Sequence, residues 1–199
     1  MFPDFLENPS DVAAPLLLGC TLTRTITLNG EKHKLVARIV ETEAYDQDDP
    51  ASHAFGGPSE RNAAMFGPAG HLYVYVSYGM HYCCNVVCGP EGFGSGCLVR
   101  AVEPLEGVEV MRELREAGRA RKRPLKLRDF TNGPGKVCAA LDIDKGLYGH
   151  DLTVEPLVLE FAPLLPGETI GRSPRVGISK NIDAPKRFFI EGNEFVSRA

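Results

Sequence analysis

The segment Lys34–Tyr45, KLVARIVETEAY, constrains the fold of this chain more than any other. Successive side chains of a strand point to opposite faces of a sheet, so every second residue of the segment shares one face. That face carries, in chain order, Leu35, Ala37, Ile39, Glu41, Glu43 and Tyr45. An apolar face that ends in two carboxylates and a phenol predicts a strand leading from a hydrophobic core to a polar site at its rim.

A second strand is predicted over His71–Ser77, where Tyr73 and Tyr75 share one face and aliphatic residues occupy the other. Tyr78 and Gly79 interrupt the pattern, and glycine within a strand often marks a bulge or a close backbone approach. Alternation alone places Tyr75 and Tyr78 on opposite faces. A bulge near Gly79 would bring the two rings to one side.

The rest of the chain predicts shorter strands, a helix that opens at Glu103-Pro104, and a short helix after Thr131–Lys136. The buried stripe of the first helix is expected to contain Leu105, Val108, Met111 and Leu114. The shorter strands are expected at Tyr82–Cys88, Cys97–Val102, Leu152–Phe161, Arg175–Ser179 and Arg187–Glu191. These elements predict a single α+β domain over residues 1–199, with a curved, mostly antiparallel, barrel-like sheet and flanking helices.

The overall charge argues against a dedicated nucleic-acid-binding protein unless basic residues gather locally. Lys and Arg number 22 against 26 Asp and Glu, which gives a net charge of −4. Eight of the 22 basic residues lie close together: Arg112, Arg115, Arg119, Arg121, Lys122, Arg123, Lys126 and Arg128. This basic cluster is either a DNA-binding surface or a solvated helix face and loop.

The six cysteines are expected to be buried free thiols. They are Cys20, Cys83, Cys84, Cys88, Cys97 and Cys138. A disulfide framework is typical of short secreted chains, and the ligand spacing of a zinc site is absent. The first residues are acidic and lack the pattern of a signal peptide, and no apolar run approaches membrane-spanning length. We therefore expect an intracellular protein without a membrane partner.

Four stretches carry a resemblance to a known family: RIVETEAY with His53 after it, MFGPAGHLYVYVSYGMHYCCN, LVRAVEPLEG and NGPGKVC. In this order they closely resemble the alkyladenine (3-methyladenine or methylpurine) DNA glycosylase family, from about Gly19 to the C-terminus. The resemblance implies a monofunctional base-excision enzyme that acts as a monomer, without a metal or cofactor. It would flip a damaged purine (3-methyladenine, 7-methylguanine, hypoxanthine or ethenoadenine) out of double-stranded DNA and hydrolyse its N-glycosidic bond.

The resemblance also implies roles for single residues of the pocket. Glu43 matches the general base that activates the attacking water, and Arg100 matches an arginine near that water. Tyr45, His53 and Tyr75 match residues that line the pocket and sandwich the flipped base. Tyrosine faces favour the cationic alkylated purines over neutral bases.

Four further positions match residues that select the base or contact DNA. Asn85 matches the residue that discriminates against the amino group of guanine, and Tyr78 matches the side chain that wedges into the helix. Lys136 lies in a stretch that resembles a phosphate-contacting segment, and Arg61 is expected to contact DNA. The intervening loop 54–60 is shorter than the family pattern, which leaves its DNA contacts open.

Two other classes of protein compete with the glycosylase reading. A non-catalytic nucleic-acid-binding module could use the tyrosines as a stacking platform, and it would need no poised carboxylate. A metal-dependent hydrolase could use Glu41, Glu43, Asp48 and Asp49 as oxygen ligands. The sequence does not decide which purine lesion is preferred.

Overall fold

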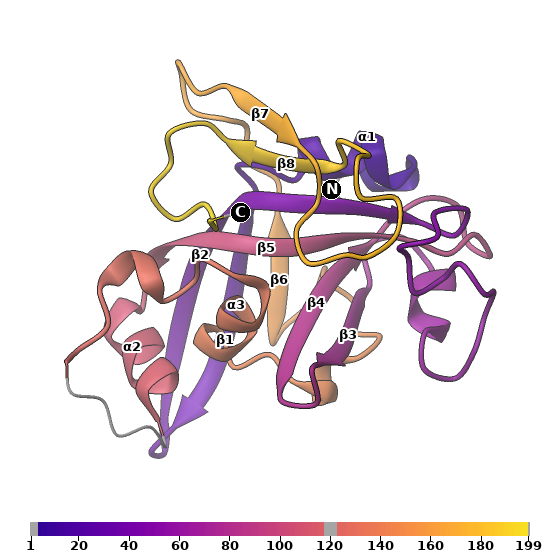
Figure 1. Cartoon of the computed structure of the whole chain (residues 1–199). Helices are drawn as coiled ribbons and strands as arrows, with labels where there is room; N and C mark the ends of the chain where they lie inside the picture. Colours follow the sequence, from indigo (N-terminus) through magenta and orange to yellow (C-terminus); the bar gives the residue numbers. More distant parts are fainter. Residues whose placement is uncertain (1–3, 118–122, 199) are drawn as a thin grey trace.

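A computed structural model describes residues 4–117 and 123–198 and contains one curled antiparallel sheet (Figure 1). The strand order is β3-β4-β5-β2-β1-β6, and β8 pairs with both β2 and β7. The strands are β1 (Thr21–Leu28), β2 (Glu31–Asp46), β3 (Leu72–Ser77), β4 (His81–Val87), β5 (Ser95–Glu106), β6 (Leu157–Glu160), β7 (Ile170–Ser173) and β8 (Arg187–Ile190). The expected α+β fold with a curved antiparallel sheet is confirmed.

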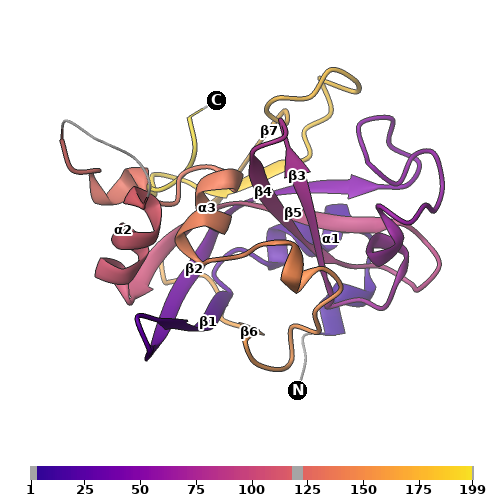
Figure 2. The ribbon, with the colours of Figure 1, turned by 90° about the horizontal axis from the view of Figure 1, so that it is seen from below.

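In the part of the chain that the structure describes, three α-helices accompany the sheet: α1 (Ser10–Leu16), α2 (Val108–Glu116) and α3 (Pro134–Ala140). Short 3₁₀ helices span Asp4–Glu7, Ala63–Phe66, Leu127–Asp129 and Lys145–Leu147. Helix α3 packs against β4 and β5, α2 packs against α3, and α1 lies on β2 (Figures 1 and 2). The hydrophobic core fills the space between the sheet and these helices, and it includes Leu22, Leu35, Val86, Val99 and Leu157.

Strand β2 is the centre of this arrangement. It pairs with β5 along most of its length, while its other edge pairs first with β1 and then, at Glu41–Glu43, with β8. Both Glu41 and Glu43 are fully buried, and Tyr45 is half-buried. The predicted continuation of one apolar face into the two acids is wrong. Ile39 pairs with Val102, but Glu41 pairs with the adjacent Ala101, so the acids lie on the face opposite that of Ile39. Both acids also lie inside the protein and not at the rim.

Three irregularities interrupt the pairing of β2 with β5, and the first, between Val36 and Ala37, leaves Leu105 as the extra residue of β5. Ile39 pairs with Val102 and Glu41 pairs with Ala101, so Val40 is the extra residue of β2. Thr42 then pairs with Val99, so Arg100 is the extra residue of β5. Bulges bend a strand and redirect side chains, and they are frequent beside active sites.

The hairpin between β3 and β4 resolves the geometry of the two tyrosines. Tyr78 (φ 50°) and Gly79 (φ 68°) both have left-handed backbones, and Met80 N–H donates to the carbonyl of Ser77 at 3.2 Å. Positive φ at both central residues is typical of a type I′ turn. The turn at the end of β3, and not a bulge within it, frees Tyr78 from the alternation that governs Tyr75.

The predicted helix start at Glu103-Pro104 is wrong. β5 continues to Glu106, because its register with β2 extends to the pair Val36 and Glu106, and α2 begins only at Val108. Gly107, with φ 75°, makes the turn between them, and a Cβ there would lie 2.5 Å from Leu35 Cδ2. Leu105 is consequently 50% exposed and does not belong to a buried stripe, whereas Met111 is buried as predicted.

The predicted strand at Arg175–Ser179 is also wrong. These residues form an irregular loop. The strand β7 immediately before them was not predicted from the sequence. The strand predicted over Leu152–Phe161 is confirmed only for Leu157–Glu160. In the loop at 175–179, Val176 donates its backbone N–H to the carboxylate of Glu43 in β2 at 2.8 Å.

All six cysteines are buried and free, as predicted. Within residues 4–117 and 123–198, no group of three or more His, Cys, Asp and Glu side chains is arranged to hold a metal ion. In the same part of the chain, no helix is long and apolar enough to cross a membrane.

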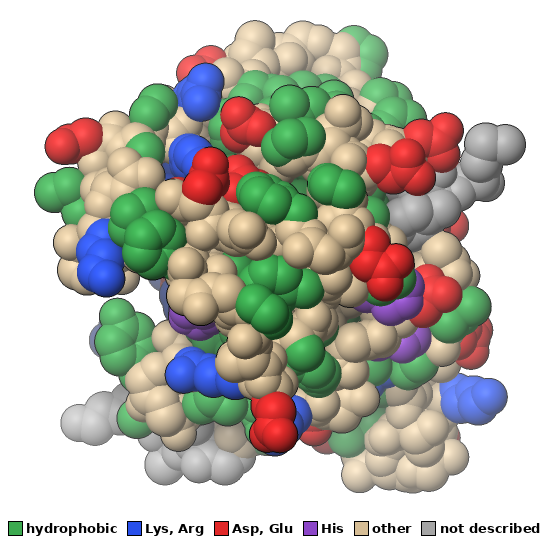
Figure 3. All heavy atoms as spheres, turned by 90° about the vertical axis from the view of Figure 1, so that its right-hand side faces the viewer, with side chains coloured by type: hydrophobic (Ala, Val, Ile, Leu, Met, Phe, Trp, Pro, Cys, Tyr) green, Lys and Arg blue, Asp and Glu red, His purple; other side chains and the backbone are tan. Residues whose placement is uncertain are grey.

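The described members of the basic cluster differ in their exposure to solvent. Arg115 is 5% exposed and its Nε donates to the carbonyl of Phe130 at 2.7 Å, while the guanidinium of Arg112 lies 5.3 Å from the Phe130 ring centroid. Arg123, Lys126 and Arg128 are exposed. The remaining members, Arg119, Arg121 and Lys122, lie outside the described residues. On the face drawn in Figure 3, charges of both signs are interspersed with apolar side chains. The described basic residues on this face do not gather into a patch.

We predict that Arg115→Ala lowers the free energy of unfolding by about 2–3 kcal/mol, because it leaves a buried carbonyl without its charged donor. Urea unfolding at pH 7 measures the change. Arg128→Ala, an exposed arginine of the same segment, is the matched control and should change stability by less than about 0.5 kcal/mol. Equal effects of the two substitutions would contradict a structural role for Arg115.

Candidate active site

A cavity of about 560 Å³ opens between the C-terminal half of β2, the β3–β4 hairpin and the loop after β7. Seven of the nine predicted site residues line it: Glu43, Tyr45, His53, Tyr75, Tyr78, Asn85 and Arg100. They come from strands β2, β3, β4 and β5, from the hairpin turn and from the loop after β2. The sheet therefore assembles in one place residues that span 58 positions of the sequence.

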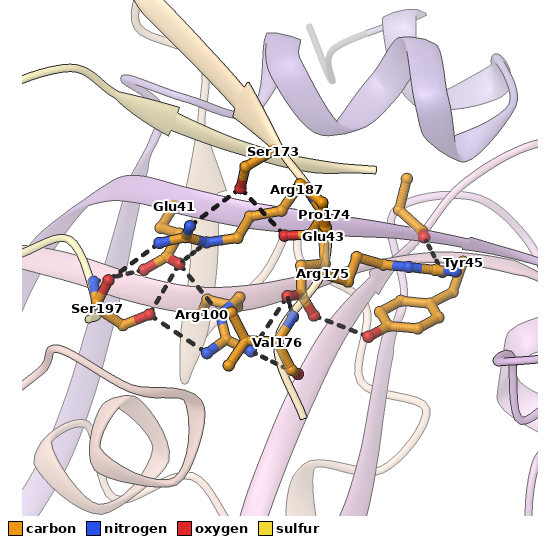
Figure 4. A network of polar contacts seen from close by, with 11 residues as sticks. Glu41, Glu43, Tyr45, Arg100, Ser173, Pro174, Arg175, Val176, Arg187 and Ser197 are labelled. Atoms are coloured by element: carbon orange, nitrogen blue, oxygen red, sulfur yellow. Dashed lines mark hydrogen bonds and ion pairs between the residues drawn. The ribbon is translucent and has the colours of Figure 1, made fainter. Parts of the chain in front are cut away.

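Glu43 lines the cavity and is fully buried, so its carboxylate lies at the floor. Figure 4 shows this carboxylate with its partners Tyr45, Val176 and Arg100. Its Oε2 accepts a hydrogen bond from the Tyr45 hydroxyl at 2.7 Å, and its Oε1 accepts one from Val176 N–H at 2.8 Å. Arg100 Nη1 lies 3.2 Å from Oε1. A carboxylate offers about four lone-pair directions, so Glu43 can accept further hydrogen bonds from the cavity side.

Arg100 is buried between two carboxylates. Its Nε donates to Glu41 Oε1 at 3.1 Å, and Nη1 faces Glu43. Burial lowers the pKa of Arg100, but the charges of Glu43 and Glu41 outweigh this effect and hold the pKa above its ordinary value. The bulge at Arg100 directs a permanently charged guanidinium along the acidic face of β2.

Glu41 does not line the cavity. Its carboxylate is bound by residues beneath the site. Its Oε1 accepts from Arg187 Nε at 2.6 Å as well as from Arg100, and its Oε2 accepts from Ser197 N–H at 2.7 Å. A buried carboxylate needs such compensation. Glu41 therefore anchors the network beneath the site.

Tyr45 is held in place by the residues that follow β7. The Arg175 guanidinium carbon lies 4.5 Å from the Tyr45 ring centroid, and Arg175 Nη1 is 2.7 Å from Asp49 Oδ2. Burial, together with the adjacent charge of Glu43, raises the pKa of Tyr45 far above its ordinary value. The Tyr45 hydroxyl consequently remains a hydrogen-bond donor to Glu43 at physiological pH.

The aromatic wall of the cavity is formed by three rings in contact. His53 and Tyr75 meet edge to face with centroids 4.5 Å apart, and Tyr73 stacks on Tyr75 at 5.6 Å. His53 Nδ1 lies 3.0 Å from the Tyr73 hydroxyl. Desolvation and the nearby charge of Arg61 lower the pKa of His53, and desolvation raises the pKa of Tyr73 to about 12. Both rings are therefore neutral at pH 7, and this wall presents flat, uncharged faces.

The remaining predicted residues lie at different depths. Asn85 is buried in β4, and its Nδ2 donates to the carbonyl of Tyr73 at 3.4 Å. Tyr78 lies at the hairpin tip with its side chain 86% exposed. Lys136, on α3, donates to Asn132 Oδ1 at 2.6 Å and does not line the cavity, although Pro134 of the same helix does.

Arg61 lines a second hollow of about 480 Å³ and not the cavity above Glu43. This hollow shares Tyr75 with the first cavity and also contains Tyr82, Lys145 and Tyr148. The shortened loop that carries Arg61 is tied to the protein by Asn62, whose Nδ2 donates to the carbonyls of His53 and Gly57 at 2.8 and 3.0 Å.

The sequence analysis did not predict four residues of the site: Arg175, Val176, Arg187 and Ser197. The first two belonged to a segment misread as a strand, and Ser197 lies near the C-terminus without a distinctive motif. Arg187, at the start of a correctly predicted strand, was the only one with a signal, because a buried strand that begins with a basic residue needs an acidic partner.

The alternative of a carboxylate metal site is not supported by the positions of its proposed ligands. Glu41 is occupied by Arg100 and Arg187, and Asp49 by Arg175 and Lys186. Asp48 is exposed. The four acids thus do not converge on one point, and guanidinium groups take the places that a cation would need.

Comparison with known proteins gives the family. The model of the methylpurine-DNA glycosylase family matches residues 4–194. The chain belongs to this family. Among its relatives, a protein of Nitrosospira multiformis is 46% identical over 195 residues, which cover 98% of this chain and 92% of the relative. A protein of Carboxydothermus hydrogenoformans is 43% identical over 188 residues, which cover 94% and 93%. Both relatives are provisionally named 3-methyladenine DNA glycosylase.

The resemblance inferred from the four sequence stretches is thereby confirmed. As a member of the methylpurine-DNA glycosylase family, the chain is a DNA glycosylase, its substrate is DNA, and its place is in base excision repair. The cavity that combines the acidic Glu43 with tyrosine side chains is the candidate site for this activity.

We predict that Asp49→Asn lowers the free energy of unfolding of the glycosylase at neutral pH, and that the loss is smaller at low pH. Burial raises the pKa of Asp49, but hydrogen bonds from Arg175, Ala51 and Asn181 outweigh it and lower the pKa from 3.8 to about 2. Because the folded-state pKa is depressed, the stabilisation is present above pH 3.8 and is lost as the pH falls through about 2.

Urea unfolding at pH 7 and pH 3 tests this prediction, with the difference between wild type and variant expected to shrink at pH 3. The exposed neighbour Asp48→Asn is the matched control and should differ from wild type by less than about 0.5 kcal/mol at both pH values. A deficit of Asp49→Asn that is the same at both pH values would overturn the prediction.

Proposed function

We propose that this glycosylase hydrolyses the N-glycosidic bond of alkylated and deaminated purines that it has flipped out of duplex DNA. The observation that carries the proposal is the buried carboxylate of Glu43 on the floor of a cavity walled by tyrosines. Extrusion is required because the anomeric carbon of a stacked nucleotide is inaccessible, and it costs a few kcal/mol. The candidate bases are 3-methyladenine, 7-methylguanine, hypoxanthine and ethenoadenine.

In the proposed reaction, Glu43 accepts a proton from a water molecule whose oxygen attacks C1′ of the sugar. The bond from C1′ to the purine nitrogen breaks, and the base leaves with the bonding electrons. The same carboxylate stabilises the positive charge that develops on the sugar, as carboxylates do in glycoside hydrolysis. Tyr45, Val176 and Arg100 orient the carboxylate through contacts of 2.7, 2.8 and 3.2 Å.

A purine alkylated at N3 or N7 is cationic and leaves as a neutral base. The faces of Tyr45 and Tyr75 favour such a cation by about 0.5–2 kcal/mol for each ring. His53 and Tyr75 touch at 4.5 Å, so the purine enters beside this pair toward Tyr45 and does not pass between them. Asn85, buried in the wall, is the proposed residue that rejects the guanine amino group.

Tyr78 is the proposed wedge, because it is a large aromatic residue that is almost entirely exposed on a left-handed turn. Side chains of this kind enter between base steps and hold a duplex open. Lys136 and Arg61 are the proposed contacts to the DNA backbone. Figure 1 shows the hairpin projecting from the sheet, which suits insertion into a groove.

Hydrolysis by water is proposed in place of a Schiff-base mechanism with strand cleavage. Lys180 lines the cavity but is exposed, whereas Glu43 is buried at its floor. Borohydride reduction in the presence of damaged duplex separates the two mechanisms. No covalent protein–DNA adduct is expected, and an adduct that disappears in Lys180→Ala would contradict the proposal.

We predict that Glu43→Gln lowers the single-turnover rate of base release by at least about 100-fold, because it removes the general base while leaving the shape of the cavity. The dissociation constant for damaged duplex should stay within threefold of the wild-type value. Glu109→Gln, at an exposed position of α2, is the matched control with unchanged rate. A binding module, the competing reading, would release no base in any of the three proteins.

A second prediction concerns the wedge. Tyr78→Ala should weaken binding to damaged duplex and slow excision by about tenfold or more, since stacking on an aromatic residue is worth about 1–3 kcal/mol. Its urea midpoint should match that of the wild type, because the side chain does not pack in the core. Tyr78→Trp should retain most of the activity. A large loss of stability in Tyr78→Ala would show that the ring is part of the core.

A further inference from the structure

Ser197 engages every polar group it has in the network beneath the proposed general base (Figure 4). Its hydroxyl donates to Glu41 Oε1 at 2.8 Å and accepts from Arg100 Nη2 at 3.2 Å. Its backbone N–H donates to Glu41 Oε2 at 2.7 Å, and its carbonyl accepts from Arg187 Nη2 at 3.0 Å. Ser197 is only 7% exposed, so these hydrogen bonds are shielded from solvent.

The guanidinium of Arg100 is held on three sides. Nε is bound by Glu41, Nη2 by the Ser197 hydroxyl, and Nη1 faces Glu43 Oε1 and, at 3.5 Å, the carbonyl of Val176. Only the third side reaches the cavity. The orientation of the first two sides therefore decides how Arg100 meets the carboxylate that acts on water.

This arrangement limits how many Arg100 nitrogens can bind Glu43. A free guanidinium pairs with a carboxylate through two parallel hydrogen bonds, and such a pair would occupy both oxygens of Glu43. Glu41 and Ser197 retain Nε and Nη2, so that a single nitrogen approaches Glu43. The second oxygen of Glu43 then stays with Tyr45 and the cavity.

We infer that Ser197, acting together with Glu41, is a positioning residue for excision: it holds Arg100 in the orientation that leaves Glu43 free to activate water. The inference rests on the proposed function, because it assigns Glu43 the role of general base. Ser197 itself touches neither the cavity nor any group of the substrate.

The test compares Ser197→Ala with Ser173→Ala in single-turnover excision from a duplex that carries one hypoxanthine. Both substitutions remove a hydroxyl from the same network, but Ser173 accepts only from Arg187, at 3.1 Å, and has no bond to Arg100. We expect Ser197→Ala to slow excision by about tenfold, because the guanidinium of Arg100 loses its hydrogen bond to the hydroxyl, with unchanged affinity for the duplex. Ser173→Ala should stay within twofold of the wild type. Equal rates for Ser197→Ala and wild type would overturn the inference.

A double-mutant cycle with Arg100→Ala distinguishes positioning from a general structural role. If Ser197 acts through Arg100, the tenfold effect should fall below twofold when Arg100 is already absent. Excision by the slower variants is followed for a day with enzyme in excess. An effect of Ser197→Ala that is equally large in both backgrounds would contradict the inference.

Stability controls keep the test decisive. The fraction folded is measured by urea unfolding at the assay temperature for every variant. Should Ser197→Ala be unfolded there, Ser197→Cys retains the size of the side chain, replaces the hydroxyl by a weak donor, and should show the same slow excision. Failure of the proposed function is recognised separately, since in that case the wild-type protein releases no base at all.

Discussion

The structure depends on the compensation of two negative charges buried in strand β2. Glu41 and Glu43 lie two residues apart on one face, each fully removed from solvent. Ionised carboxylates in such a place are tolerated only with paired cations and donated hydrogen bonds. Arg100 from β5 and Arg187 from β8 supply the positive charge, and Val176 and Ser197 supply backbone N–H groups.

This requirement explains the architecture around the site. The edge of β2 opposite β5 belongs to β1 over its first half, and at Glu41 it passes to β8, which brings Arg187 to the acid. The loop after β7 closes over Glu43 and places Arg175 against Tyr45. Segments from the last quarter of the chain thus form part of the floor and one wall of the cavity, while the β3–β4 hairpin forms the opposite, aromatic wall.

The net charge of −4 takes on a different meaning in this structure. Several of the acids that dominate the sum, Glu41, Glu43, Asp46 and Asp49, are buried and paired with arginine or lysine, and so contribute little to the outer field. Arg115, in turn, is removed from the basic cluster by its bond to Phe130. Neither the acidity of the chain nor the cluster at 112–128 is a direct measure of how the surface meets DNA.

The sequence alone determined the parts of the protein that follow from local backbone geometry and from motifs. Alternation within β2 and β3 placed Glu41, Glu43 and Tyr45 on one face and paired Tyr73 with Tyr75, and the four family-like stretches identified seven residues that line the cavity. Local patterns failed where a partner distant in the sequence decides the conformation. Glu103–Glu106 stays in a strand because β2 pairs with it, and the segment 175–179 is a loop in which Val176 donates its N–H to Glu43. Only the tertiary structure could reveal that Ser197 contacts Glu41 and Arg100. The buried carboxylate and guanidinium find hydrogen-bond partners in space and not among their neighbours in the sequence, so no local pattern predicts the contact.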